Sequence, residues 1–192
     1  MSLVMTSGPA VEPITLDEAK AHLRVEHAAD DALIASVIIT SRLHVEAALG
    51  LALITQGWSY FIDAWPKARE IILPIRPVQT LNAIRVYTDD TTYVTLPANT
   101  FALDGAGLPA RIVRTASTAP ARPARATGGI EFNITAGFGP TAASVPAPIR
   151  QALLLLVTHW YEHRDPLEIG SPDTRIPSAV STLLQPYKPV RL

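Results

Sequence analysis

The sequence contains no cysteine, which removes several kinds of chemistry at once. Without thiols the chain can form neither disulfide bonds nor thiolate metal sites, and it has no cysteine nucleophile. Charged residues are also scarce, at 17% against an ordinary fraction of about 25%. The formal net charge of −1 gives no overall attraction to nucleic acid, because such binding depends on neutralising phosphates with Lys and Arg. The chain as a whole is not expected to bind DNA.

Two further absences concern membranes and export. The longest strongly apolar run, residues 152–157, is much shorter than the roughly 18 to 20 residues that cross a bilayer. The N-terminal segment lacks the positive start and the long apolar region of a secretory signal. We therefore expect a cytoplasmic protein that does not enter a membrane.

Apolar residues, in contrast, are abundant. They make up 48% of the 192 residues, which is enough for a real hydrophobic core in one domain, with or without an insertion. Since few charges accompany them, part of the apolar surface could be covered by neighbouring subunits.

The N-terminal part of the chain carries two helix patterns. Thr15 and Glu18 have the spacing of a capping box, which predicts a short helix to about residue 23. A second helix is expected to begin at residues 30–31 and to stop at residue 50, where a glycine can adopt a left-handed conformation. Arg42 and Glu46 lie four residues apart, and we expect them on the solvent face of this helix.

Helical periodicity returns near the C-terminus. Pro148 is preset for a first helical turn, and the helix should close before Asp165, which precedes a proline. Apolar residues occur on nearly every face of this helix, so we expect it to be buried on several sides. A last short helix, at 178–184, must dock on other elements to be stable.

Between the helical parts the pattern changes to short β segments with many prolines at their ends. The expected strands are 55–63, 70–73, 81–87, 93–96, 111–114 and 129–136. The acidic pair at 89–90 is interpreted as a hairpin turn rather than a catalytic dyad. The expected fold is α+β, with a mainly helical core, an inserted small β-domain and a short C-terminal helix. The parts are 1–52 (helical), 53–140 (β-rich, with a flexible loop at 115–129), 141–166 (central core helix) and 167–192 (linker, short helix and docking tail).

A group of arginines lies between Asp104 and Glu131, where the sequence has no acidic residue. A solvated loop is the favoured interpretation, and a surface for DNA phosphates or a protein partner is the alternative. A stand-alone protein-binding module could use such a surface. The arginines of this basic loop are Arg111, Arg114, Arg122 and Arg125.

The best candidate for catalysis is a cluster of His159, Glu162, His163 and Asp165. The two histidines are one helical turn apart and could share a metal ion, so a metal-dependent hydrolase is an alternative function. The run lacks the glutamate placement of the zinc-protease helix and has no obvious third ligand nearby. We favour a wet helix end whose cationic groups suit the helix dipole. No serine or glycine motif indicates a nucleophile or a phosphate-binding loop. We therefore assign no catalytic, metal-binding or cofactor-binding residue.

Five blocks of the sequence, in order and covering almost the whole chain, together resemble the head-tail connector, or adaptor, family of tailed phages and gene transfer agents. They are Ile-Thr-Leu-Asp-Glu-Ala-Lys-Ala-His-Leu-Arg-Val at 14–25 with Asp30-Asp31, Leu-Pro-Ile-Arg-Pro-Val at 73–78, Ile-Thr-Ala-Gly-Phe-Gly at 134–139 with Val145-Pro146, the run 149–164, and the weaker block 176–187. The sequence departs from the family pattern at 121–125, where Ala-Arg-Pro-Ala-Arg replaces an expected Trp-Pro pair, and at Lys188, where arginine is common.

The resemblance implies a structural virion protein without catalytic residues or cofactors. It implies a ring of subunits, twelve in number, in the particle neck beneath the portal vertex, assembled in the bacterial cytoplasm. The ring would bind the portal protein and join it to the stopper, the head-completion protein or the tail, and DNA would pass through it only as cargo.

Two sets of residues are expected to serve such an assembly. The first set, on the central helix, would form the core and the wall between subunits: Ile149, Leu153, Leu154, Leu156, Val157 and Trp160. The second set, near the C-terminus, would dock on the portal: Ile176, Val180, Leu183, Leu184 and Tyr187.

Overall fold

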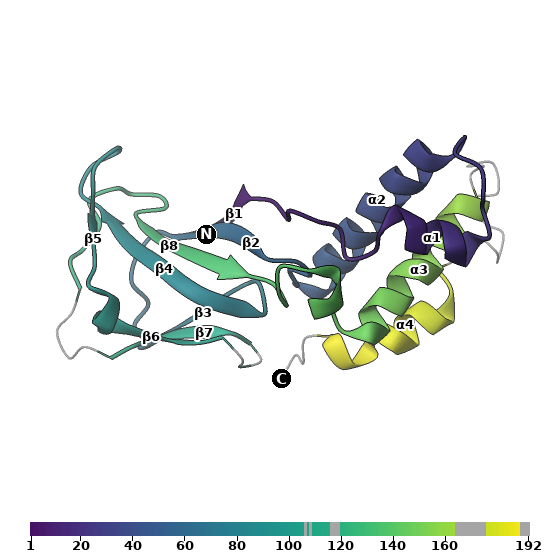
Figure 1. Cartoon of the computed structure of the whole chain (residues 1–192). Helices are drawn as coiled ribbons and strands as arrows, with labels where there is room; N and C mark the ends of the chain where they lie inside the picture. The colour runs from purple at the N-terminus through teal and green to yellow at the C-terminus, as the bar shows by residue number, and fades with distance from the viewer. Residues whose placement is uncertain (106, 108, 116–119, 164–175, 189–192) are drawn as a thin grey trace. The chain divides into compact units, whose positions relative to one another are not determined.

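The computed structural model of the chain describes residues 1–105, 107, 109–115, 120–163 and 176–188 (Figure 1). The chain divides into two compact units, and it passes from one to the other three times. The β unit consists of Met1–Pro9 and Gly50–Phe138, and the helical unit consists of Ala10–Leu49 and Gly139–Leu192. The predicted α+β fold, with a β-rich insertion between helices, is confirmed.

The β unit contains a five-stranded and a three-stranded antiparallel sheet. The larger sheet has the order β1-β2-β8-β4-β5, and the smaller has the order β3-β7-β6. The strands are β1 (Ser2–Ser7), β2 (Gln56–Ile62), β3 (Glu70–Ile72), β4 (Val78–Tyr87), β5 (Tyr93–Thr95), β6 (Phe101–Asp104), β7 (Arg111–Arg114) and β8 (Ile130–Ala136).

Strand β8 lies at the centre of the larger sheet and supplies much of the core. Its even-numbered residues, Ile130, Phe132, Ile134 and Ala136, are fully buried, as expected for one face of a strand. Phe132 packs near Tyr60 of β2 and Trp65, with ring centroids 6.2 and 6.1 Å away respectively.

The hairpin between β4 and β5 turns at the predicted acidic pair. The carboxylate of Asp89 accepts hydrogen bonds from the backbone N–H groups of Thr91 (2.8 Å) and Thr92 (2.6 Å). Hydrogen bonds from the Thr92 hydroxyl and from these two amides hold the pKa of Asp89 well below its usual range. The side chain is used to close the turn, which agrees with its interpretation as a structural residue.

The sequence patterns did not predict two strands, β1 and β6. Residues 2–7 were placed with the N-terminal helical part, but β1 pairs with β2 and so belongs to the β unit. Five of its six residues are exposed, so β1 has no alternation of buried and exposed positions to reveal it. β6 has only four residues, and it pairs with the predicted strand β7.

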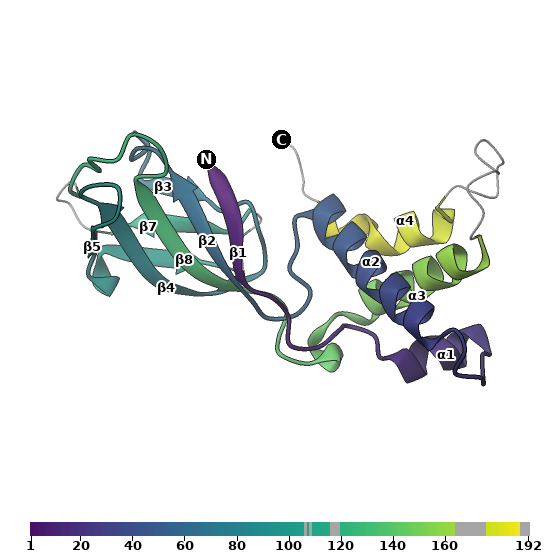
Figure 2. The ribbon, with the colours of Figure 1, turned by 90° about the horizontal axis from the view of Figure 1, so that it is seen from above.

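Four α-helices form the described part of the helical unit (Figure 2). They are α1 (Leu16–Leu23), α2 (Asp31–Leu49), α3 (Ala147–Glu162) and α4 (Ser178–Leu184). Single 3₁₀ turns occur at Ala98–Thr100, Ala142–Ser144 and Gln185–Tyr187. Helix α3 contacts all three other helices, which confirms it as the central helix of this unit.

Local signals set several helix ends as predicted. At the start of α1, Thr15 and Glu18 form the reciprocal capping box, and the hydrogen bond from the Thr15 backbone helps to lower the pKa of Glu18. Glu18 also pairs with Arg150 of α3. Gly50 follows α2 with φ of 63°, the left-handed conformation that glycine adopts without steric cost.

The expectation that no segment is long and apolar enough to cross a membrane is wrong for helix α2. By length and composition it could do so, with a mean hydropathy of 1.5 over its most apolar window. Polar residues such as Ser36, Thr40 and Ser41 divide it, so its uninterrupted apolar runs are short. The buried core helix of a globular unit passes the same test, and α2 packs against α1 and α3.

Candidate functional site

The candidate interface residues on α3 are mostly core residues. Four of them are at most 1% exposed, so the helical unit itself covers them: Ile149, Leu153, Leu156 and Val157. Leu154 and Trp160 retain partial exposure, and the indole of Trp160 meets the His44 ring edge to face at 5.5 Å. Of the six residues, only these two offer surface to a partner.

The histidine cluster lies only partly at a wet helix end. Glu162 and His163, at the end of α3, are exposed as expected, whereas His159 is buried. The two imidazole rings lie 4.7 Å apart, and Nδ1 of His163 is 2.8 Å from the carbonyl oxygen of His159. Among the described residues, no group of three or more His, Cys, Asp or Glu side chains could hold a metal ion. Asp165, the remaining acidic neighbour, lies outside them.

Arg42 and Glu46 also depart from the prediction, because both are buried rather than solvated. Arg42 contacts Glu46 at 2.8 Å and Glu12, from the segment before α1, at 2.8 Å. Burial alone lowers the pKa of Arg42, but the hydrogen bond to Glu12 and the charges of Glu46 and Glu12 outweigh it and raise that pKa. Arg42 can be buried because two carboxylates from different segments, those of Glu12 and Glu46, balance its charge.

The opposite face of α2 is exposed and uncharged. We call it the α2 outer face, and its most apolar members, Leu33, Ile39 and Leu43, are 36%, 42% and 48% exposed. The whole face comprises Ala32, Leu33, Ser36, Ile39, Thr40, Leu43, His44, Ala47 and Ala48. Since this face contains no Lys, Arg, Asp or Glu, α2 exposes an apolar side to solvent while its charged residues Arg42 and Glu46 are buried.

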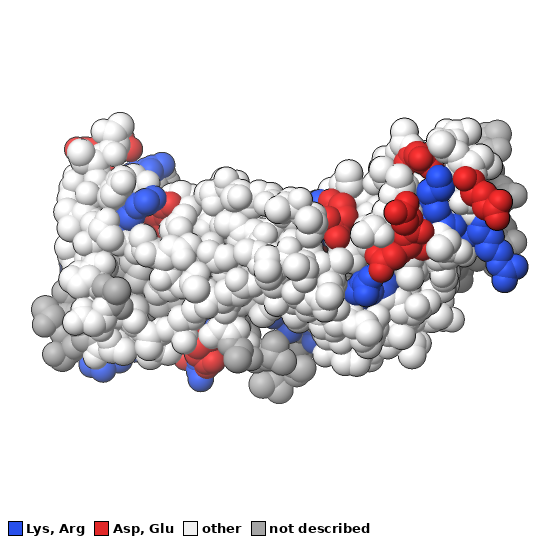
Figure 3. Space-filling model, in the orientation of Figure 1, with Lys and Arg blue, Asp and Glu red and all other residues white. Residues whose placement is uncertain are grey.

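Charged side chains gather elsewhere on the helical unit. On the face shown in Figure 3 they lie over α1 and its neighbours. They include the ion pairs of Lys20 with Asp31, at 2.6 Å, and of Glu18 with Arg150.

The C-terminal candidate residues divide into buried and accessible groups. Val180 and Leu184 are buried on α4, which packs against α3. Ile176 is exposed, and Leu183 and Tyr187 are half-buried. Of the five candidates, only the last three have side chains that a partner could reach.

The basic loop is not a single positive patch. Arg111 pairs with Glu70 at 3.1 Å and with Asp104 at 3.0 Å, so its charge is balanced. Glu70 is 41 residues away in the sequence, which is why the pattern alone overlooked it. Arg114, Arg122 and Arg125 instead line one hollow of the β unit.

The loop at 115–129 was expected to be flexible, and residues 116–119 lie outside the described part. The following residues are tied to the β unit by hydrogen bonds. Ala121 accepts one from the Trp65 indole N–H at 2.9 Å, and the Ala124 N–H donates to the Tyr87 carbonyl at 2.9 Å. The described part of this loop therefore has a defined path.

A buried polar network on the larger sheet escaped the sequence prediction. Glu131 of β8 is 5% exposed and accepts hydrogen bonds from Ser59 (2.6 Å), Tyr87 (3.0 Å) and Arg85 (3.3 Å). Burial and the contact with Glu131 raise the pKa of Tyr87. These residues come from three strands, so no sequence spacing could have revealed the network. Hydrogen bonds from three residues hold the carboxylate in place, so we interpret the network as a stabilising feature rather than a reactive one.

Comparison with known proteins gives one sequence match and several structural ones. Residues 13–89 match the phage gp6-like head-tail connector protein family. In structure, the chain is similar to a chain in the neck of an empty GTA particle computed with C6 symmetry, with a TM-score of 0.84 and 28% identity. It is also similar to a chain in the virion of a native gene transfer agent (GTA) particle, with a TM-score of 0.85 and 26% identity. A third match is a chain in the neck of a native GTA particle computed with C12 symmetry, with a TM-score of 0.82 and 28% identity. Each match covers 100% of this chain and 97% of the other. No curated protein sequence matches significantly.

The predicted resemblance to head-tail connectors is thus confirmed in two ways. The family match contains the first two sequence blocks, which end at residue 78. The structural matches extend over the whole chain and include the blocks on β8, α3 and α4.

Proposed function

We propose that this chain, which shares the sequence pattern and the whole fold of head-tail connector proteins, is a structural subunit of the neck of a phage or gene transfer agent particle and not an enzyme. The observation that carries the proposal is the structural match over the full length of both chains at 28% identity. A shared core alone would not extend through the β unit, the helical unit and the short C-terminal helix.

The subunit would form a ring, with twelve copies, under the portal vertex. Two of the similar chains belong to necks computed with C12 and C6 symmetry, which supports repetition around an axis. In a cyclic ring each subunit uses two different surfaces, one for each neighbour. The uncharged α2 outer face suits one of these contacts, because a neighbouring subunit that covers it buries no Lys, Arg, Asp or Glu side chain of this face.

The ring would join the portal protein to the stopper or tail and let DNA pass. A net charge of −1 supports passage, since tight phosphate binding would hold the DNA in place. The accessible C-terminal residues Ile176, Leu183 and Tyr187 would contact the portal. Leu154 and Trp160 would lie at the wall between subunits.

Mixing the purified chain with portal rings from the same particle tests this function. Electron microscopy should show a stoichiometric ring added to one end of the portal. The variant Ile176→Ser/Leu183→Ser/Tyr187→Ser should fold but fail to bind. Deleting the C-terminal segment that contains these residues would be a poor test, because its residues Val180 and Leu184 belong to the core of the helical unit. Portal rings that remain bare with the unaltered chain would refute the proposal, and unchanged binding by the triple variant would refute the docking residues.

A further inference from the structure

Three arginines of the β unit surround one hollow of about 540 Å³. Arg114 is at the end of β7, and Arg122 and Arg125 come from the loop that leads to β8. The remaining walls are largely apolar and include Trp65, Pro120 and Pro123. The hollow therefore combines guanidinium groups with walls that can receive carbon chains.

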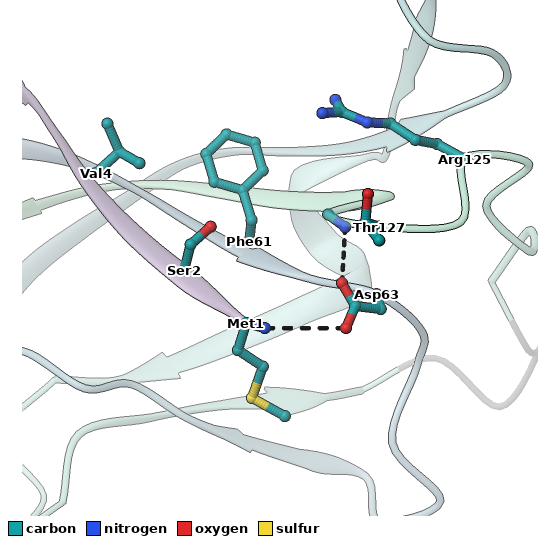
Figure 4. A pocket seen from close by; sticks show the side chains of 8 residues that line it. Met1, Ser2, Val4, Phe61, Asp63, Arg125 and Thr127 are labelled. Carbon is teal, nitrogen blue, oxygen red and sulfur yellow. Dashed lines mark hydrogen bonds and ion pairs between the residues drawn. The ribbon is translucent and has the colours of Figure 1, made fainter.

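Asp63 is the one acidic residue that lines this hollow among the described residues, and its carboxylate is already in use. It accepts a hydrogen bond from the backbone N–H of Gly128 at 2.7 Å and lies 3.8 Å from the amino group of Met1. Figure 4 shows both contacts in an adjoining pocket, which Asp63 and Arg125 also line. One carboxylate against three guanidinium groups leaves a net positive charge around the hollow.

The guanidinium groups keep donors available. Nε of Arg114 is buried and has no hydrogen-bond partner among the described residues. Cζ of Arg125 lies over the Tyr87 ring, 5.0 Å from its centroid, which is a cation–π contact. Arg122 is exposed. The exposed guanidinium of Arg122 can therefore donate to an acceptor placed in this hollow, and a hydrogen bond between charged groups favours binding.

The net charge of the whole β unit is positive, as is that of the residues around the hollow. This unit contains eight Lys and Arg against six Asp and Glu, although the whole chain carries a net charge of −1. The residues of the unit outside the described part, at 106, 108 and 116–119, are Ala, Leu, Ser and Thr, so they add no carboxylate. The hollow is a positive site on a chain that is otherwise slightly negative.

We propose that this hollow binds an acidic peptide segment of a partner protein, with a Glu or Asp carboxylate held by Arg114 and Arg122. Guanidinium groups match carboxylates with two parallel hydrogen bonds, and the proline and indole walls suit the carbon atoms of a peptide. Duplex DNA is the less suitable ligand, because phosphates are bound by cations spread along an open surface rather than around a hollow of side-chain size. The inference depends on the β unit alone and not on the proposed function.

Titration of the full-length chain with a fluorescent oligoglutamate peptide tests the site. The peptide should bind, and oligoglutamine should not. Arg114→Gln and Arg122→Gln should each weaken the affinity about tenfold, the loss expected for a hydrogen bond between charged groups. Arg111→Gln is the matched control, because Arg111 is balanced by Glu70 and Asp104, and it should leave the affinity unchanged.

Three results would overturn the proposal. They are no binding of oligoglutamate, an equal loss with Arg111→Gln, and tighter binding of a short DNA duplex with the same dependence on Arg114 and Arg122. The last result would reassign the hollow to phosphate. Arg122 is exposed, so Arg122→Gln should fold normally and keeps the test decisive even if Arg114→Gln does not fold.

Discussion

The guanidinium of Arg42 is held between two carboxylates inside the helical unit. Glu46 is 9% exposed and Glu12 is only partly exposed, so removing the cation leaves negative charge in a poorly hydrated place. Arg42→Met should therefore lower the free energy of unfolding by about 3 kcal/mol, since breaking a buried ion pair from one side is strongly destabilising. Urea denaturation followed by circular dichroism measures this loss.

A double variant serves as the control for this prediction. Arg42→Met/Glu46→Met removes the buried carboxylate together with the cation, and Glu12 can turn toward water. We expect it to be clearly more stable than Arg42→Met alone. If the two variants lose the same free energy, the ion pair does not explain the burial of this face.

The predictability of single residues follows the sequence distance of their partners. The capping box of Thr15 and Glu18 spans three residues, so the local pattern identifies it. The contact of Arg42 with Glu12 spans 30 residues, and that of Arg111 with Glu70 spans 41. A spacing rule assigns such charges to solvent, because it has no information about a carboxylate that the fold brings in from another segment.

At the scale of elements, α3 has the largest share of fully buried side chains in the helical unit. Leu156 is 0% exposed, and Leu154, two residues earlier on the same helix, is only half-buried. Leu156→Ala should lower the free energy of unfolding by about 2 to 5 kcal/mol through lost burial and a cavity. Leu154→Ala should cost less than half as much. The two midpoints of thermal or urea unfolding give the comparison, and equal losses would contradict the assignment of the buried face.

Elements were predictable where periodicity and end signals agreed. Helix α3 has a proline in its first turn and a dense apolar pattern, and its predicted range differs from the observed one by few residues. The edge strand β1 has neither signal, since nearly all its residues are exposed and its pairing with β2 joins segments about 50 residues apart. Strand formation there depends on the partner strand, which a local pattern does not contain.

For the whole molecule, the unusual distribution of polarity on α2 leads to a prediction about assembly. Ile39 and Leu43 lie four residues apart on the α2 outer face, so two glutamates there would form one acidic patch. Ile39→Glu/Leu43→Glu should leave the helical content and the unfolding midpoint of the isolated chain nearly unchanged, because both side chains are exposed. The same variant should not form rings on the portal, since burying two unpaired carboxylates at a contact between subunits is strongly unfavourable.

Gln151→Glu provides the matched control, because Gln151 is also exposed but lies on α3. It adds negative charge to the same unit without touching the α2 outer face, and rings should still form. Electron microscopy of chain and portal mixtures distinguishes the two variants. Normal rings from Ile39→Glu/Leu43→Glu would show that neighbouring subunits meet elsewhere, and the partly exposed Leu154 and Trp160 of α3 would then be the next residues to alter. Loss of rings in both variants would instead indicate sensitivity to the net charge of the unit rather than to one surface.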